Sequence, residues 1–306
     1  MTSAPPATSP TERPAPMALS TIGLFVFVVT AWSLNWVVMK LAVQDITPLW
    51  AVTIRTALAA AVLIPALCAN RQFVRPPRAD YPIVLVISVF HMVAFAALMT
   101  AGLTYVSAGR AIVLGYTTPL WVAPAAFLFL KERMSVRQMV GIGVGMAGLL
   151  LLVGPSAFDW KSREAILGNG LPILAAICWS VSIVYTRAHR WTATPLQLMP
   201  WQCLLATAVL ATLAFFFEGP PPIRMSTPAI LALVYNGVIG TALGFWAMTV
   251  VNRRVPAVTA ALGVLATPAL GIGLAALLLG EGLDPILVLS ALVIMAGLSI
   301  GAKPWT

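Results

Sequence analysis

The fold is indicated by a stretch of the chain that occurs twice. The two occurrences are PLWVAPAAFLFLKERMS at 119–135 with GIGVGMAGLLLL at 141–152, and PALGIGLAALLLGEGLD at 268–284 with ALVIMAGLSI at 291–300. At a constant offset of 149, Pro119 aligns with Pro268 and Glu132 with Glu281. The sequence therefore contains an internal repeat.

A second register, offset by 147, covers the earlier part of each copy. It aligns Trp32-Ser33 with Trp179-Ser180. Chance identity among Ala, Leu and Val is common, but matched Trp-Ser, Thr-Pro and Glu pairs at constant offsets are not. We infer that the chain is a duplication of one unit.

The composition indicates that this unit lies in a membrane. Of the 306 residues, 60% are hydrophobic and 9% are charged, whereas a soluble domain carries about 25% charged residues. Spanning helices need about 20 apolar residues, and an all-helical backbone satisfies its own hydrogen bonds in lipid. Ten segments meet this requirement, at 20–43, 48–69, 81–102, 107–130, 136–154, 168–188, 195–217, 227–250, 256–279 and 285–302.

Ten spans divide the basic residues unequally between the two sides of the membrane. Twelve Lys and Arg residues fall on the side that holds both termini, five fall on the other side, and Arg55 lies inside the second segment. Cytoplasmic loops are the ones rich in Lys and Arg, so both termini are expected in the cytoplasm. The net charge of +9 is therefore explained by basic loops that orient the protein in the membrane. No nucleic-acid partner is expected.

The segments define the predicted domain organisation. It consists of a disordered cytoplasmic tail at 1–19, a first five-helix repeat at 20–154, an external linker at 155–167, a second five-helix repeat at 168–302 and a cytoplasmic C-terminus at 303–306. Because five is odd, the second repeat enters the membrane from the opposite side. The predicted fold class is an all-α integral membrane protein with ten transmembrane helices arranged as two inverted five-helix repeats. Inverted repeats are typical of secondary transporters, which bind substrate where the halves meet.

The quoted stretches resemble the drug/metabolite transporter superfamily, in particular its ten-helix branch with paired EamA domains. The shared pattern is an aromatic-Ser pair in the first helix of each unit, a Pro midway along the fourth, L-x-x-x-E and a Gly-rich fifth helix. The resemblance covers residues 20–302 and is greatest to bacterial exporters of aromatic and other neutral amino acids. It implies export of small metabolites, with amino acids favoured, across the bacterial inner membrane by alternating access.

Two alternatives to an amino-acid exporter stay open. One is a multidrug or other metabolite exporter on the same scaffold, and the other is an integral-membrane enzyme. An enzyme would need a cluster of carboxylate, His or Cys side chains at the membrane surface, but Cys68, Cys178 and Cys203 all lie inside apolar segments. We therefore expect no enzyme activity, cofactor or metal site. The expected partners are a small-molecule substrate and the lipid bilayer, and the expected state is a monomer.

Two ionisable side chains within the segments are candidates for substrate contact. His91 lies midway along the third segment, where it either contacts substrate or is a neutral imidazole bonded to a neighbouring helix. Arg55 lies about 10 Å into the second segment, at 1.5 Å per residue. It either extends to the headgroups or meets a substrate carboxylate, and its repeat partner is the neutral Gln202. All nine carboxylates fall in the tail, in loops or near helix ends, so coupling is expected to be absent or carried by His91.

The other candidates are aromatic and polar side chains within the segments. Trp32 and Trp179 lie deep and are flanked by hydroxyl groups, which suits a pocket for an amphipathic solute, whereas most membrane tryptophans are interfacial anchors. The full set of predicted substrate-binding residues is His91, Trp32, Asn35, Tyr116, Trp179, Ser182, Tyr185, Asn236, Trp246 and Arg55.

Paired prolines predict hinges in the fourth and ninth segments. Pro119 and Pro268 each remove a helical hydrogen bond and kink the helix. The carbonyl groups of Gly115 and Val264 lose their usual donor, and a neighbour, water, a ligand or a Thr or Ser hydroxyl must replace it. The Gly-rich fifth and tenth segments predict close helix packing.

Overall fold

The computed structural model describes residues 19–131, 135–153, 162–221, 225–254, 264 and 266–301. The predicted tail before Leu19, the part of the predicted linker before Ser162, the C-terminus at 303–306 and Glu132 lie outside these ranges.

Every secondary-structure element within the described ranges is a helix. In chain order they are α1 (Leu19–Ala42), α2 (Pro48–Ala69), η1 (Arg78–Asp80), α3 (Tyr81–Val86), η2 (Ile87–Phe95), α4 (Ala96–Gly102), α5 (Ala108–Gly115), α6 (Thr118–Leu130), α7 (Val136–Val153), α8 (Arg163–Ala188), α9 (Pro195–Glu218), α10 (Thr227–Val234), η4 (Tyr235–Leu243), α11 (Gly244–Arg254), α13 (Ala266–Leu279) and α14 (Pro285–Gly301).

Seven helical segments in the described ranges are long and apolar enough to cross a membrane. Three shorter apolar helices, Val136–Leu152, Ala266–Leu279 and Pro285–Gly301, coincide with the predicted fifth, ninth and tenth segments. The prediction of a helical, multi-pass membrane protein is therefore confirmed.

Helix α8 begins five residues before the predicted sixth segment. Helix α8 begins at Arg163 because the side chain of Ser162 accepts a hydrogen bond from the N–H group of Ala165 and so caps the helix. Residues 163–167, predicted to belong to the linker, are therefore helical.

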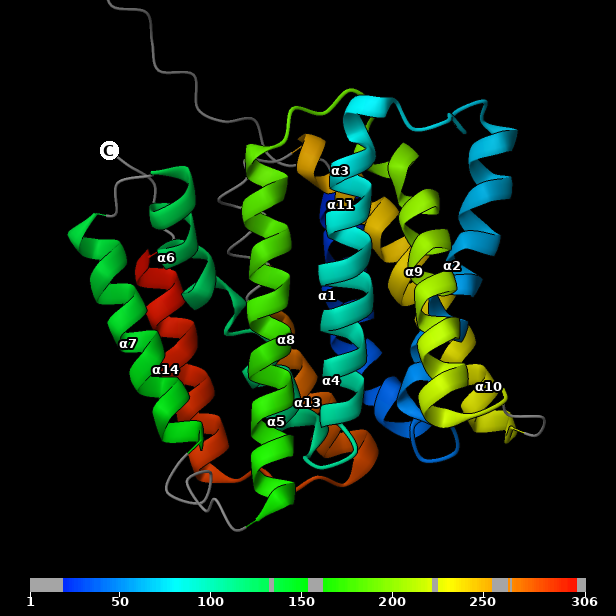
Figure 1. Cartoon of the computed structure of the whole chain (residues 1–306). Coiled ribbons are helices and arrows are strands. Elements are labelled where there is room, and N and C mark those ends of the chain that lie inside the picture. Colours follow the sequence, from blue (N-terminus) through cyan, green and yellow to red (C-terminus); the bar gives the residue numbers. More distant parts are fainter. Residues whose placement is uncertain are drawn as a thin grey trace, which may run out of the picture.

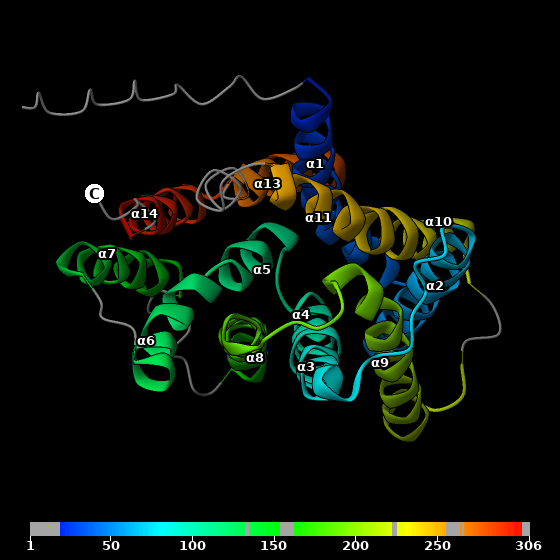
Figure 2. The same ribbon diagram turned by 90° about the horizontal axis from the view of Figure 1, so that it is seen from above.

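The helices run side by side along the molecule (Figure 1). Seen from above, α7 and α14 pack as a pair at one end, and α2 packs against α9 at the other (Figure 2). Between these pairs, α8 lies against α4 and α1 packs against α13 and α11. The middle of the bundle is therefore built from helices of both copies.

The pair α7 and α14 shows the predicted close packing of Gly-rich helices. A Cβ atom on Gly297 would lie 2.5 Å from the backbone nitrogen of Gly145, and one on Gly141 would lie 2.6 Å from the carbonyl oxygen of Gly297. These two backbones touch, so the positions admit no side chain.

Two helical segments of nine residues each have π geometry, η2 (Ile87–Phe95) and η4 (Tyr235–Leu243). They are related by an offset of 148, between the two registers of the sequence repeat. A π segment places an extra residue in the helical turn and is found mostly at functional sites. Both segments lie midway along their spans.

Carboxylates of the second copy bind the first turns of helices in the first copy. Glu281 accepts hydrogen bonds from the backbone N–H groups of Ala108 and Gly109 at 2.7 and 3.1 Å, at the start of α5. Glu218, which ends α9, binds the first turn of α2 in the same way at 2.9 and 3.1 Å. Helix N-termini favour negative charge, so these contacts join the two copies at one end of the bundle.

A third carboxylate joins the copies at the opposite end. Asp80, at the start of the third span, is completely buried. It accepts hydrogen bonds from the backbone N–H groups of Thr192 and Ala193 at 3.2 and 2.7 Å, and lies 2.8 Å from Nε2 of His189. As the sequence predicts, these three carboxylates lie near helix ends.

Candidate functional site

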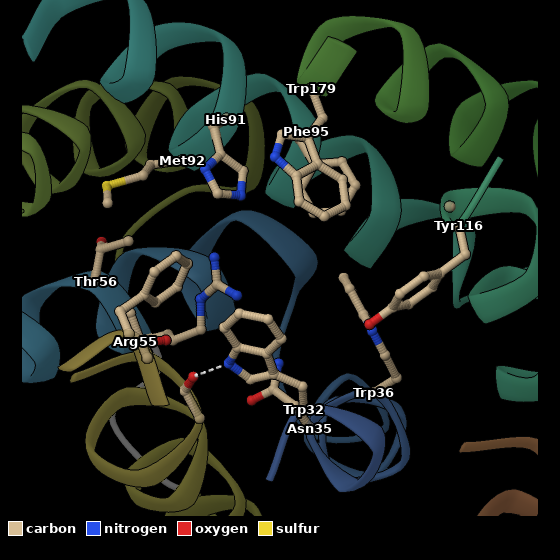
Figure 3. A pocket seen from close by; sticks show the side chains of 14 residues that line it. Trp32, Asn35, Trp36, Arg55, Thr56, His91, Met92, Phe95, Tyr116 and Trp179 are labelled. Atoms are coloured by element: carbon tan, nitrogen blue, oxygen red, sulfur yellow. Dashed lines mark hydrogen bonds between the residues drawn. The ribbon is translucent and has the colours of Figure 1, made fainter. Parts of the chain in front are cut away.

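A cavity of about 100 Å³ lies in the middle of the bundle. This is several times the ~10–15 Å³ that admits one water molecule, so the cavity has room for a small solute. Both copies line it, the first through α1, α2, η2 and the end of α5, and the second through α8, η4 and α11 (Figure 3). The lining residues are Trp32, Asn35, Trp36, Arg55, Thr56, His91, Met92, Phe95, Gly115, Tyr116, Trp179, Gly240, Thr241 and Phe245.

Aromatic rings form much of the cavity wall. The ring of His91 stacks on Trp179, with centroids 5.1 Å apart and 9° between the planes. Phe95 lies 4.8 Å from Trp179, and Phe245 lies 6.0 Å from His91 and 5.5 Å from Trp32. Rings in this arrangement offer faces and edges to another planar apolar group.

Glycines of η4 and α11 let the polar side chains of α1 approach. The indole Nε1 of Trp32 donates a hydrogen bond to the carbonyl oxygen of Gly240 at 3.1 Å. A Cβ atom on Gly240 would lie 2.0 Å from Oδ1 of Asn35, and one on Gly244 would lie 2.7 Å from Nε1 of Trp32. Glycine is required at both positions to set the orientation of Trp32 and Asn35.

Two polar side chains in the lining keep a buried atom without a partner. These atoms are Nε of Arg55 and Oδ1 of Asn35. Buried polar atoms are normally hydrogen-bonded. The two unsatisfied atoms therefore make Arg55 and Asn35 candidates for contact with a ligand.

Six of the ten predicted substrate-binding residues come together in this cavity. They are Trp32, Asn35, Arg55, His91, Tyr116 and Trp179. His91 makes ring contacts, and no described residue forms a hydrogen bond with its imidazole, so the alternative of a histidine bonded to a neighbouring helix is not observed.

The other four predicted residues lie outside the cavity lining. Asn236 is buried and donates hydrogen bonds from Nδ2 to the carbonyl oxygens of Asn35 and Ala232, both at 3.3 Å. Ser182 is buried within α8. Tyr185 stacks on His189 with a centroid distance of 6.2 Å. The fourth, Trp246, lines a separate groove beside the end of α2.

Eight lining residues were not among the predicted substrate-binding residues. They are Trp36, Thr56, Met92, Phe95, Gly115, Gly240, Thr241 and Phe245. Helical spacing is a signal for two of them, since Trp36 and Phe95 follow Trp32 and His91 by four residues. Phe245 faces the cavity in place of its neighbour Trp246.

The fourth span breaks where Pro119 predicts a kink. Helix α5 ends at Gly115 and α6 begins at Thr118. The hydroxyl group of Thr118 donates to the carbonyl oxygen of Gly115 at 2.7 Å, and that of Thr117 to the carbonyl oxygen of Leu114 at 2.6 Å. Threonine hydroxyls therefore replace the lost backbone donor.

The ninth span carries the matching proline. Pro268 is buried near the start of the described part of α13. Next to it, the carbonyl oxygen of Thr267 lies 3.0 Å from Oγ of Ser33, so this part of α13 is attached to α1.

The described cysteine and histidine side chains are not gathered with carboxylates into one group. No group of three or more His, Cys, Asp or Glu side chains lies together in the part of the chain that the structure describes. In this part, Cys68, Cys178 and Cys203 are free thiols.

In this chain, the two sequence repeats together enclose a cavity within a helical, multi-pass membrane protein. This is the architecture of a small-molecule transporter. Residues 19–154 and 166–300 each match the EamA-like transporter family. The chain belongs to this family, within the paired-EamA branch of the drug/metabolite transporter superfamily.

Several bacterial relatives of the chain are named as transporters. The chain is 25% identical over 267 residues to the uncharacterized transporter YoaV of Bacillus subtilis, covering 87% of this chain and 91% of that protein. It is 29% identical over 293 residues to a probable amino-acid metabolite efflux pump of Escherichia coli, covering 90% and 93%. A crystal structure with a TM-score of 0.62 and 20% identity covers 91% of this chain and 96% of that chain, and so shares the fold.

Proposed function

We propose that this protein exports amino acids, aromatic or neutral, across the bacterial inner membrane. In this proposal the chain spans the membrane ten times as two inverted five-helix halves, and both termini are cytoplasmic. The observation that carries the proposal is the aromatic cavity lined by both copies. Relatives named as probable amino-acid metabolite efflux pumps support the choice of substrate.

The chemistry of the cavity suits an amphipathic solute with a planar apolar part. Trp179 and Phe95 offer ring faces for that part. Asn35 and Arg55 offer polar atoms for the other end of the molecule. An apolar site with a few polar groups is typical of small-molecule pockets.

Alternating access requires contacts between the halves to break at one end of the bundle while they form at the other. The hydrogen bonds of Glu281 and Glu218 join the halves at one end, and those of Asp80 join them at the opposite end. We assign these contacts to the two gates. Pro119 and Pro268 interrupt spans four and nine between the gates and serve as hinges.

The test is exchange of labelled amino acids by the purified protein in liposomes. We expect exchange of phenylalanine and other neutral amino acids, and Trp179→Ala should lower its rate about tenfold by removing a main ring of the wall. Trp246→Ala is the matched control, because Trp246 lies outside this cavity. Exchange of cationic dyes with no exchange of any amino acid would instead favour the multidrug alternative.

A further inference from the structure

The cavity contains a positive charge with no negative partner. Arg55 lies on α2 and is half-buried, with its Nε buried and unsatisfied. No lining residue carries a carboxylate. Among the described carboxylates, Asp80, Glu218 and Glu281 are bound at helix ends, and Asp45, Glu164 and Asp284 are exposed. A buried cation without a counter-ion is costly, so the cavity favours a ligand that supplies the negative charge.

The guanidinium group of Arg55 is directed into the cavity. Figure 3 shows the Arg55 side chain extending into the space among Trp32, His91 and Trp179. An arginine that extended to the membrane surface would leave this lining. The position of Arg55 in the cavity lining therefore favours the substrate contact over the headgroup contact, the two roles that the sequence left open.

The repeat provides an internal comparison for Arg55. Its counterpart at the 147-residue offset is Gln202, on the matching helix α9. Gln202 is buried, neutral and outside the cavity lining. The five-helix unit therefore does not need an arginine at this position to fold, and the charge at Arg55 needs an explanation of its own.

We propose that the cavity recognises its substrate by a carboxylate, which Arg55 binds, and that the amino group of the substrate is dispensable. This inference rests on the proposed export function and specifies its substrate class as aromatic carboxylates. The planar guanidinium matches a carboxylate through two parallel hydrogen bonds, while the aromatic part lies against Trp179 and Phe95. An ammonium group finds neutral oxygen atoms, such as Oδ1 of Asn35, and ring faces in the cavity, but no carboxylate and a neighbouring cation in Arg55, so organic cations are disfavoured.

The test uses three ligands that differ only in their charged groups. Phenylalanine carries both the carboxylate and the ammonium, phenylpropanoate carries the carboxylate alone, and phenethylamine carries the ammonium alone. Binding to the purified full-length protein is measured by calorimetry. We expect the two carboxylates to bind with similar affinity, each about tenfold or more tighter than phenethylamine.

Variants then assign the effect to Arg55. Arg55→Gln should weaken both carboxylates by about 10- to 100-fold and should not weaken phenethylamine, whose ammonium is freed from a like charge. Arg55→Lys keeps the charge without the planar fork and should lie between Arg55→Gln and the unchanged protein. Arg163→Gln, which removes an exposed charge at the start of α8, is the control and should change nothing. If Arg55→Gln does not fold, the proposal is still tested by two measurements. These are the relative affinities of the three ligands for the unchanged protein and their affinities for Arg55→Lys.

Two results would overturn this inference: phenethylamine binding as tightly as the carboxylates, or full carboxylate affinity in Arg55→Gln. Its failure can be told apart from that of the proposed function. If the protein exchanges amino acids and Arg55→Gln does not change the rate of that exchange, this inference is refuted and the proposed function is not. If the protein exchanges phenylpropanoate but no amino acid, amino-acid export is refuted and the recognition of a carboxylate by Arg55 is not.

Discussion

Gly297→Ala should destabilise the protein without weakening substrate binding. The new Cβ atom would lie 2.5 Å from the nitrogen of Gly145 and 2.6 Å from the oxygen of Gly141, closer than the 3.0 Å below which such contacts essentially do not occur. The neighbours are backbone atoms, so α7 and α14 must separate by about 0.5–1 Å. Overpacking of this kind costs about 1–3 kcal/mol.

The assay is thermal unfolding of the purified protein. Unfolding is followed by the fluorescence of a thiol-reactive dye or by loss of the monodisperse peak in size-exclusion chromatography. A cost of 1–3 kcal/mol corresponds to a decrease in Tm of about 2–10 °C. Gly143→Ala is the control on the same helix pair, because a Cβ atom there meets nothing within 4 Å. Affinity should stay unchanged, since neither helix lines the cavity. Equal Tm values for Gly297→Ala and Gly143→Ala would refute the packing argument.

Three further substitutions test the site and the gates. Gly240→Ala should displace Asn35 and lower substrate affinity about tenfold in calorimetry, and unchanged affinity would mean that Asn35 does not contact substrate. Pro119→Ala should join α5 to α6 and slow exchange while affinity is kept, and an unchanged exchange rate would reduce Pro119 to a packing role. Glu281→Gln should weaken the contact with Ala108 and Gly109 by about 1.5–3 kcal/mol and raise thiol labelling of Gly109→Cys, whereas unchanged labelling would argue against a gate.

Most of the helical architecture could be predicted from the sequence because a spanning helix is fixed by length and apolarity alone. The start of α8 at Arg163 was missed because a polar turn capped by Ser162 lies beyond the apolar run. The close packing of α7 on α14 follows from glycine spacing and needs no knowledge of the other helices.

The candidate site could be predicted only in part, because α-helical periodicity fails where the helix changes type. The π segments η2 and η4 add a residue to the turn, which rotates the faces that follow them. Trp246, just after η4, was expected in the cavity as an aromatic side chain within a span, but its neighbour Phe245 lines the cavity instead. Asn236 was expected to contact substrate as a polar side chain within a span, but it holds α1 through the carbonyl oxygen of Asn35.

The central claim is that substrate occupies the aromatic cavity between the two copies. Its most direct test is protection of Thr241→Cys from a small thiol reagent, in a protein whose Cys68, Cys178 and Cys203 have been replaced by Ala. A saturating concentration of phenylalanine should slow labelling of Thr241→Cys about tenfold and leave Thr104→Cys, in an exposed turn, unaffected. Equal labelling rates at Thr241→Cys with and without substrate, in protein that still exchanges phenylalanine, would contradict the claim.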